Sequence, residues 1–447
     1  MHGNLRYVKS VLIGLIVALG VASPARAEVV TSRADRGILG VAADGTPWVA
    51  FNVGRMLFVS VRTPQGSWLF RSLGALPGSN ATLAGIKIHE RPHRYVTVLT
   101  QDRQGRWIAL ARGSRITAIA RAGTGSSYGA AGLAVDAHGR PAVAYAVLRP
   151  SGKTFLRLVT FDDRGKLHRH AITQKGFPRS ALPPGAAPVL VNGRLHVVET
   201  YTSAAIDWGP TAKGGWEGQY LFASQLGSPQ GRVGAVYLAP TLWSAWTQVY
   251  PETTPADLVV LLGSSSEAQT TLELTHGIFV AIASGESTPE VAAYDWVTIA
   301  DDFPVYAGLV LQAPGGQAWQ LDGRLDGFAI ARAGAHQVLL FREGELQWFR
   351  SPGALPGVRL TMLAVDATGQ TSGTVTGATG GAVQIYREVP HAARELVATC
   401  PVAADGSFHA SGLRSSDDNL YRAVYIDPVT TVPFSFLPGV PVGVGGS

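Results

Sequence analysis

The chain alternates short apolar runs with polar turns, and its clearest feature is that one such pattern recurs. Residues 41–51 (VAADGTPWVAF) resemble residues 135–145 (VDAHGRPAVAY), each with an apolar run, a polar turn containing Gly-x-Pro, and a second apolar run. The copies start 135 − 41 = 94 residues apart, which is twice 47, and residues 88–98 hold a degenerate copy at the midpoint. Short apolar runs bounded by Gly and Pro predict β-strands, so we expect a repeated unit built from strand hairpins.

The repeat can be followed through most of the chain. With steps of 47 residues and a single step of 54, the centre of the second strand recurs at Val49, Val96, Val143, Val197, Ser244, Val291 and Val338. A unit of about 47 residues holding four short strands is typical of one blade of a β-propeller. The sequence therefore predicts an all-β fold with a seven-bladed propeller over residues 28–369, with six or eight blades as alternatives. The last unit is one strand short, and residues 29–33 or residues 359–365 could supply that strand.

The repeat ends at about Gly369, and a different strand pattern follows. Residues 372–375 (SGTV), 382–386 (AVQIY), 404–408 (ADGSF) and 421–425 (YRAVY) resemble the Ig-like or transthyretin-like β-sandwich of carboxypeptidase regulatory-like domains. The likeness implies a small accessory domain over residues 370–436, used for spacing or adhesion. We expect residues 437–447, which are rich in Gly, Pro and Val, to be a flexible tail. Taken together, the chain resembles secreted bacterial β-propeller proteins with such a domain at the C-terminus.

The first 27 residues have the three parts of a secretory signal peptide. Arg6 and Lys9 precede an apolar run over residues 11–21, and Ala25, Arg26 and Ala27 form a small-residue cleavage site. A membrane anchor is the alternative, but the run is about half of the ~20 residues that a spanning helix needs. We therefore expect cleavage after Ala27 and an extracellular or cell-envelope protein. No later segment is long and apolar enough to suggest a membrane span in the mature chain.

Composition and charge limit the classes of partner. The formal net charge is +6, and removal of residues 1–27, which hold three basic residues and no acid, lowers it to 6 − 3 = +3. The remaining basic residues form no run, so nucleic acid is not expected. Cys400 is the single cysteine and cannot form an internal disulfide. The partners that remain are a glycan or an extracellular protein, and the oligomeric state is left open.

Two short motifs resemble catalytic signatures but stand in the wrong context. Residues 89–93 (HERPH) match the H-E-x-x-H zinc motif, which requires a helix that Pro92 would break. Residues 125–129 (GSSYG) match the G-x-S-x-G nucleophile elbow, but a strand rather than a helix is predicted after them. We therefore predict no catalytic residue, no metal site and no cofactor.

A binding face is easier to locate. Resemblance to propellers implies that ligands use the central channel and the face carrying the loops after the second strands. In units four to six these loops are long and rich in aromatic and acidic residues, which predicts a ligand site formed by Asp207, Trp208, Trp216, Glu217, Trp246, Tyr250, Glu252, Tyr294, Asp295 and Trp296. Aromatic rings pack on sugar C–H groups while carboxylates accept hydroxyl hydrogen bonds, so a glycan suits this set.

The sequence favours a non-catalytic binding or scaffold protein whose ligand is a glycan or a protein partner. The alternative is a polysaccharide-active enzyme, a glycoside hydrolase or lyase, using carboxylates of units four to six. A hydrolase would need a facing pair of carboxylates in one cleft. The candidates for such a pair are Asp207, Glu217, Glu252, Asp295 and Asp301.

Overall fold

The fold is all-β, as predicted from the sequence. The structure is a computed structural model, which describes residues 27–436 except 91–94, 174–175, 179–183, 202–203, 224–227, 250–256, 265–268, 275–276, 286–287, 300–302, 313–317, 333, 379, 390–391 and 415–419. Every regular element in this part of the chain is a β-strand. The described residues include no helix of the length and apolarity that crossing a membrane requires.

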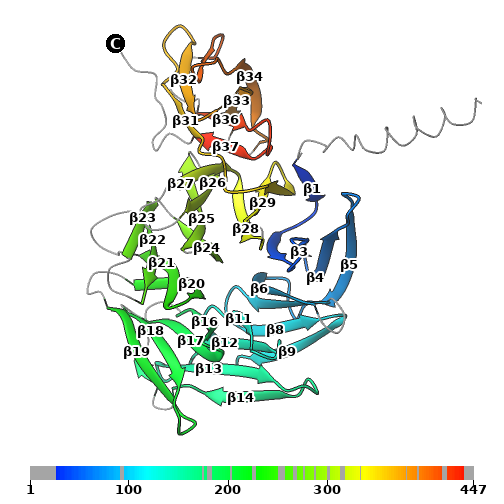
Figure 1. The fold of residues 1–447 in the computed structure, drawn as a ribbon, viewed down its shortest axis with the longest axis vertical. Helices are drawn as coiled ribbons and strands as arrows, with labels where there is room; N and C mark the ends of the chain where they lie inside the picture. The colour runs from blue at the N-terminus through cyan, green and yellow to red at the C-terminus, as the bar shows by residue number, and fades with distance from the viewer. Residues whose placement is uncertain are drawn as a thin grey trace, which may run out of the picture.

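Most strands belong to sheets of consecutive antiparallel strands (Figure 1). Sheet 1 contains β2 (Arg36–Val41), β3 (Pro47–Val53), β4 (Met56–Arg62) and β5 (Trp68–Ala75), and sheet 2 contains β6 (Ala81–His89), β7 (Tyr95–Asp102), β8 (Trp107–Arg112) and β9 (Arg115–Arg121). Sheet 3 contains β11 (Gly132–Val135), β12 (Pro141–Leu148), β13 (Lys153–Phe161) and β14 (Leu167–Ala171), with the short β10 (Ser127–Tyr128) and β15 (Phe177–Pro178) paired alongside.

The next sheets repeat the same order. Sheet 4 contains β16 (Ala186–Val191), β17 (Arg194–Tyr201), β18 (Ala204–Pro210) and β19 (Trp216–Ala223), and sheet 5 contains β20 (Ser228–Leu238), β21 (Thr241–Val249), β22 (Asp257–Gly263) and β23 (Gln269–Leu274). Sheet 6 begins with β24 (Ile278–Ser284), β25 (Pro289–Ile299), β26 (Phe303–Gln312) and β27 (Ala318–Asp322), and sheet 7 contains β28 (Arg324–Ile330), β29 (His336–Arg342), β30 (Glu345–Ser351) and β1 (Glu28–Thr31).

The first strands of these sheets contact one another in a closed cycle. β2 contacts β6, the contacts continue through β11, β16, β20 and β24 to β28, and β28 contacts β2 again. All of these strands line one central cavity of about 410 Å³. The sheets therefore surround a common channel with their first strands innermost.

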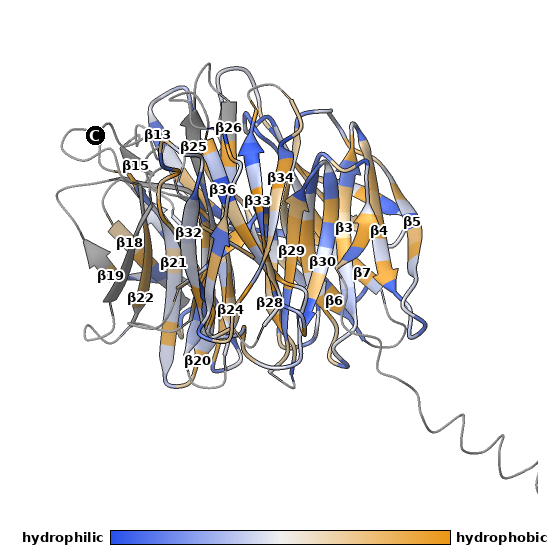
Figure 2. Cartoon of the chain, turned by 90° about the horizontal axis from the view of Figure 1, so that it is seen from above, coloured by the Kyte–Doolittle hydropathy of each residue, from blue (hydrophilic) through white to orange (hydrophobic). Residues whose placement is uncertain are grey.

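The repeat positions are structurally equivalent. Val49, Val143, Val291 and Val338 each lie on the second strand of a sheet and are buried, with 0–2% of their surface exposed, and the other three repeat centres are also buried on second strands. Separate apolar clusters fill the space between successive sheets, for example between sheets 3 and 4 and between sheets 4 and 5. Figure 2 shows apolar residues along the strands around the ring. Each sheet buries its two faces against two neighbours, which a single sheet could not do alone.

The N-terminal strand closes the ring. β1 pairs antiparallel with β30, and Val30 is buried in the cluster between sheets 7 and 1. The Glu28 carboxylate accepts two hydrogen bonds from the Arg62 guanidinium on sheet 1, each 2.6 Å long. Of the two segments that could complete the last unit, the N-terminal one is used. The other contains β31 (Arg359–Met362), which pairs with β32 (Thr371–Thr376) instead.

The C-terminal segment adds two further groups of strands. β31 and β32 form a small sheet with β35 (Ser407–Ala410), while β33 (Ala382–Glu388), β34 (Glu395–Pro401), β36 (Leu420–Ile426) and β37 (Pro433–Phe436) form a second group. β37 pairs with β27 through Leu321 and Phe434, so this second group continues sheet 6. One apolar cluster runs from sheets 6 and 7 into the C-terminal strands. The C-terminal segment is thus packed directly against the ring.

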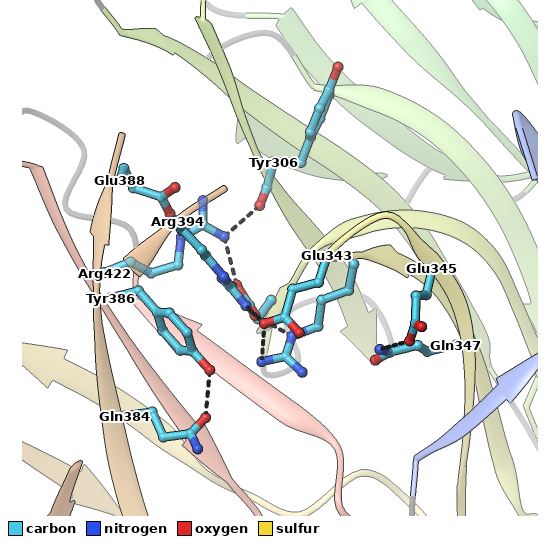
Figure 3. Close-up of polar contacts among 11 residues, drawn as sticks. Tyr306, Glu343, Glu345, Gln347, Gln384, Tyr386, Glu388, Arg394 and Arg422 are labelled. Carbon is cyan, nitrogen blue, oxygen red and sulfur yellow. Dashed lines mark hydrogen bonds and ion pairs between the residues drawn. The ribbon is translucent and has the colours of Figure 1, made fainter. Parts of the chain in front are cut away.

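A buried ion network holds the two parts together (Figure 3). Asp322, at the end of β27, accepts hydrogen bonds from Arg342 at 2.6 Å, from Arg394 at 2.7 and 2.8 Å, and from Arg422 at 2.7 Å. Burial alone would raise the pKa of Asp322, but the charges of these arginines hold it far below its usual range. Arg422 also pairs with Glu388 at 2.7 Å. A carboxylate of the ring therefore compensates two arginines of the C-terminal segment.

Candidate functional site: an aromatic groove between sheets 3 and 4

Two of the predicted tryptophans come together in a groove at the outer edge of the ring. Trp208 lies on β18, and Trp216 is the first residue of β19. The opposite wall is the end of β14 with the residues that follow it, and the cavity between them measures about 670 Å³. Both indoles are half-buried and pack at the margin of the apolar cluster between sheets 3 and 4. Each ring therefore keeps part of its surface accessible in the groove.

The strand register makes the aromatic residues share one face of sheet 4. Trp208 pairs with Gly218, and Ile206 pairs with Tyr220, so these side chains lie on the same face as Trp216. A Cβ atom on Gly218 would lie 3.0 Å from Cζ3 of Trp208, and the absence of that atom lets the indole lie close over the strand. Tyr220 is 69% exposed. The alternation Trp216-x-Gly218-x-Tyr220 is visible in the sequence. Of these three residues, only Trp216 was predicted to belong to the site.

A buried glutamate fixes the orientation of Trp208. The indole Nε1 donates a hydrogen bond of 3.0 Å to Oε2 of Glu199, which lies on β17 and is fully buried. Burial raises the pKa of Glu199 to about 7, and the Trp208 hydrogen bond only partly opposes this rise. Sequence reasoning missed Glu199, which the pairing of β17 with β18 places on the same face of the sheet as Trp208.

Polar groups border the groove. The His170 Nε2 atom lies 3.0 Å from Oγ1 of Thr160, and the imidazole is exposed. Burial of part of the ring, and then the charge of His168, lower the pKa of His170. At the other end, Thr211 Oγ1 accepts a hydrogen bond of 3.0 Å from the Gly215 amide in the turn between β18 and β19. The arrangement is an aromatic wall with hydrogen-bonding groups at its rim.

The predicted carboxylates do not join the tryptophans. Asp207 neighbours Trp208 on β18, and Glu217 neighbours Trp216 on β19, so strand alternation turns both toward sheet 5. Asp207 is occupied there by His196, whose Nδ1 lies 3.0 Å from Oδ1 of the carboxylate. The expected combination of aromatic rings and carboxylates at one point is therefore wrong for this sheet.

The predicted loop positions also need correction. Trp208 and Trp216 flank the turn between the third and fourth strands of sheet 4, which opposes the connection between the second and third strands in an antiparallel sheet. Trp246 lies on β21 with no exposed surface, and its Nε1 donates to Gln248 at 2.9 Å, so a ligand cannot reach it. These residues are spread over strands rather than gathered on one loop face.

The remaining predicted residues lie elsewhere. Tyr294 and Asp295 are half-buried neighbours on β25, and Tyr294 lines the mouth of the central channel. Tyr250, Glu252, Asp301 and the side chain of Trp296 lie outside the described residues. Of the residues predicted to form one ligand site in units four to six, Trp208 and Trp216 thus line the groove and Tyr294 lines the channel.

The described residues of the two motifs that resemble catalytic signatures have structural roles. His89 ends strand β6, stacks on Tyr95 with ring centroids 4.2 Å apart, and bonds Thr97 Oγ1 through Nε2 at 2.9 Å. Burial, aided by the charge of Arg112, lowers the pKa of His89 to about 4. Ser127 pairs with Leu148 in a β-ladder, not at a strand-to-helix turn. No group of three or more metal-ligating side chains was found among the described residues.

Comparison with known proteins gives distant structural likeness only. No protein-family model matches the chain. No curated protein matches it either. Among solved structures, a catalytically inactive virginiamycin B lyase from Staphylococcus aureus, crystallised with quinupristin, shares 14% identity with a TM-score of 0.45, covering 72% of this chain and 97% of that one. AofleA from Arthrobotrys oligospora shares 12% identity with a TM-score of 0.40, covering 67% of this chain and 90% of that one.

Proposed function

We propose that this chain is an exported, non-catalytic seven-bladed β-propeller that binds a glycan in the groove between sheets 3 and 4. In this proposal residues 1–27 are a cleaved signal peptide, sheets 1 to 7 are the blades, and residues 370–436 form an Ig-like sandwich. N-terminal sequencing of the exported protein should begin at Glu28. A chain that retains residues 1–27 would contradict the export proposal without touching the binding proposal.

The observation that carries the binding proposal is the half-buried pair Trp208 and Trp216 on one wall of the groove. Flat apolar rings pack well against the C–H face of a pyranose, while the sugar hydroxyls need polar partners around it. The side chain of His170 and the backbone of Gly214 and Gly215 lie at the groove and can supply such partners. Fixed aromatic anchors also lose little conformational entropy when a ligand binds.

The enzyme alternative receives less support from the carboxylates. Asp207 is held by His196 on the face turned away from the groove, and Glu217 shares that face. Glu199 is near the groove and has a raised pKa, but it is fully buried behind Trp208 and has no access to a substrate. A hydrolase requires carboxyl groups that reach both sides of the scissile bond. We therefore favour binding without catalysis.

A glycan-array screen of the mature protein tests the proposal directly. Binding to at least one glycan should be lost or fall about thirtyfold or more in Trp216→Ala, since a hot-spot aromatic contributes about 2 kcal/mol or more. Trp68→Ala is the matched control, because Trp68 is also half-buried and also begins the fourth strand of its sheet. Equal loss in both variants, or no glycan bound by the wild type, would refute the assignment.

A further inference from the structure

The central channel opens into a second cavity whose mouth is rich in arginine. This cavity of about 470 Å³ lies where several first strands begin, and its lining includes Arg36 at the start of β2, Arg103 just after β7, and Arg232 on β20. The other polar side chains of the lining are those of Thr82, Gln101, Tyr294 and Asp326. Residues from five sheets therefore meet at one place, although 36, 103 and 232 are far apart in the sequence.

Irregular strand pairing shapes this mouth. Four of the innermost strands, β6, β20, β24 and β28, carry a register shift against their second strands. In β20 the shift lies between Gln230 and Val233, and in β28 it lies between Leu325 and Gly327. Residues inside such bulges leave the regular alternation and can be aimed away from the sheet. Arg232 and Asp326 are in these segments, which explains why both line the channel.

Arg232 reaches across the channel. Its guanidinium donates to the carbonyl oxygen of Val280 on the neighbouring β24, at 3.2 Å, and to that of Leu83 on β6. Because β6 is three places from β20 in the cycle of first strands, the side chain bridges the lumen. Arg232 lines both the mouth and the inner cavity. It therefore lies at the boundary between them and forms the floor of the mouth.

The described lining of the mouth holds three arginines, Arg36, Arg103 and Arg232, and a single carboxylate, Asp326. Asp326 is already engaged, with Arg324 donating at 2.6 and 2.8 Å and the Gly37 amide donating at 2.8 Å. Within the described residues, Arg36, Arg103 and Arg232 make no ion pair. Burial lowers the pKa of Arg232; Tyr294 and the charge of Asp326 oppose this fall, and the smaller effect of the Arg36 charge adds to it. Excess positive charge in a confined site favours an anion.

We propose that the channel mouth binds a small molecule through an oxyanion group, either a carboxylate or a sulfate or phosphate. Arg36 and Arg103 would hold the oxyanion from the rim, and Arg232 would face it from the floor. Guanidinium groups suit this task because their planar N–H donors match oxyanion geometry. The Tyr294 hydroxyl, which has no hydrogen-bond partner among the described residues, adds a donor at the side of the cavity. This site is separate from the aromatic groove and does not depend on the glycan proposal.

The test is calorimetric titration of the purified full-length mature chain at low ionic strength with sulfate, inorganic phosphate and glucuronate as separate probes. At least one probe should bind saturably, and the three arms show whether the site prefers a carboxylate or a tetrahedral anion. Arg36→Gln and Arg103→Gln should each weaken binding about tenfold, the loss of one charge-assisted hydrogen bond. Added sodium chloride should weaken binding further by screening.

Arg71→Gln is the matched control, because Arg71 is exposed on β5 and does not line the mouth. Its affinity should equal that of the wild type. Arg103 is exposed and Arg36 is half-buried without a partner in the described chain, so neither substitution should prevent folding. Absence of saturable binding for all three probes, or equal affinity in the two mouth variants and the wild type, would overturn the proposal.

Discussion

The Nε1 atom of Trp208 donates a hydrogen bond of 3.0 Å to the fully buried carboxyl group of Glu199. The pair joins the wall of the groove to the interior of sheet 4, since Trp208 is half-buried while Glu199 has no exposed surface. An ionisable group thus lies directly behind an aromatic ring that we assign to ligand binding. The protonation of one and the position of the other should be linked.

The first prediction concerns the pH dependence of stability. The pKa of Glu199 is raised to about 7 in the folded chain, against an ordinary value of 4.5. Because the folded state keeps the proton that the unfolded state releases, this group lowers the free energy of unfolding as pH rises from 4.5 to 7, by at most about 3 kcal/mol. Glu199→Gln keeps an acceptor for Trp208 and removes the titration. Denaturant unfolding at pH 5, 6, 7 and 8 measures the effect.

The difference between wild type and variant isolates Glu199 from other titrating groups. Burial lowers the pKa of His336, but the hydrogen bond to Glu290, the charge of Glu290 and the carbonyl oxygens of Gly353 and Gly334 together raise it overall. That pair stabilises the fold below about pH 6.5 and loses its contribution as pH rises through the raised pKa, in the wild type and the variant alike. A constant difference between the two proteins at all four pH values would disprove the shift at Glu199.

A second prediction uses the contact between Gly218 and Trp208. Gly218→Val would place side-chain atoms against Cζ3 of Trp208, which already lies 3.0 Å from the position of a Cβ atom. The indole must move, so glycan affinity should fall about tenfold while the fold persists. Gly123→Val is the control, since a Cβ atom at this exposed position would have no neighbour within 4 Å. Unchanged glycan binding by Gly218→Val would show that the ring position does not matter.

A third prediction concerns the ion network at the junction with the C-terminal strands. Asp322→Asn removes the charge that compensates Arg342, Arg394 and Arg422, whose side chains are only 4–13% exposed. Breaking a buried pair in this way costs about 3–5 kcal/mol, because unpaired charges stay buried. Thermal unfolding should show a clearly lower midpoint, and limited proteolysis should cut the C-terminal segment first.

Asp163→Asn provides the comparison for Asp322. Asp163 is 86% exposed and meets Arg140 at 3.6 Å, so its loss should change stability by less than about 1 kcal/mol. Equal midpoints for the two variants would mean that the network does not hold the C-terminal strands to the ring.

A fourth prediction tests ring closure through two adjacent residues. Val30 is 2% exposed between sheets 7 and 1, whereas its neighbour Val29 is 47% exposed. Val30→Asp buries an unpaired charge and should destabilise the chain by several kcal/mol, while Val29→Asp should change stability by about 0.5 kcal/mol or less. Chemical unfolding of both variants gives the comparison. If Val30→Asp were as stable as Val29→Asp, β1 would not be part of the core.

A large part of the fold could be predicted from the sequence, because the strands and turns of the repeat are encoded by residues that are close together along the chain. A strand, a Gly-containing turn and a second strand are encoded within about ten residues, so the equivalence of Val49, Val143, Val291 and Val338 could be recognised from their spacing. The same local logic could have separated Asp207 from Trp208, since neighbouring residues of a strand face opposite sides. That separation was missed because these residues were predicted to lie in loops.

What the sequence determined by itself was the length of the repeating unit and the all-β class, together with two of the residues that line the groove, Trp208 and Trp216. Tertiary structure alone decided that β1 completes sheet 7, that Asp322 meets arginines from the C-terminal strands, and that Arg36, Arg103 and Arg232 converge on the channel. Those relationships join residues tens to hundreds of positions apart. They arise only when the ring of sheets closes, so no local pattern of hydrophobic and polar residues records them.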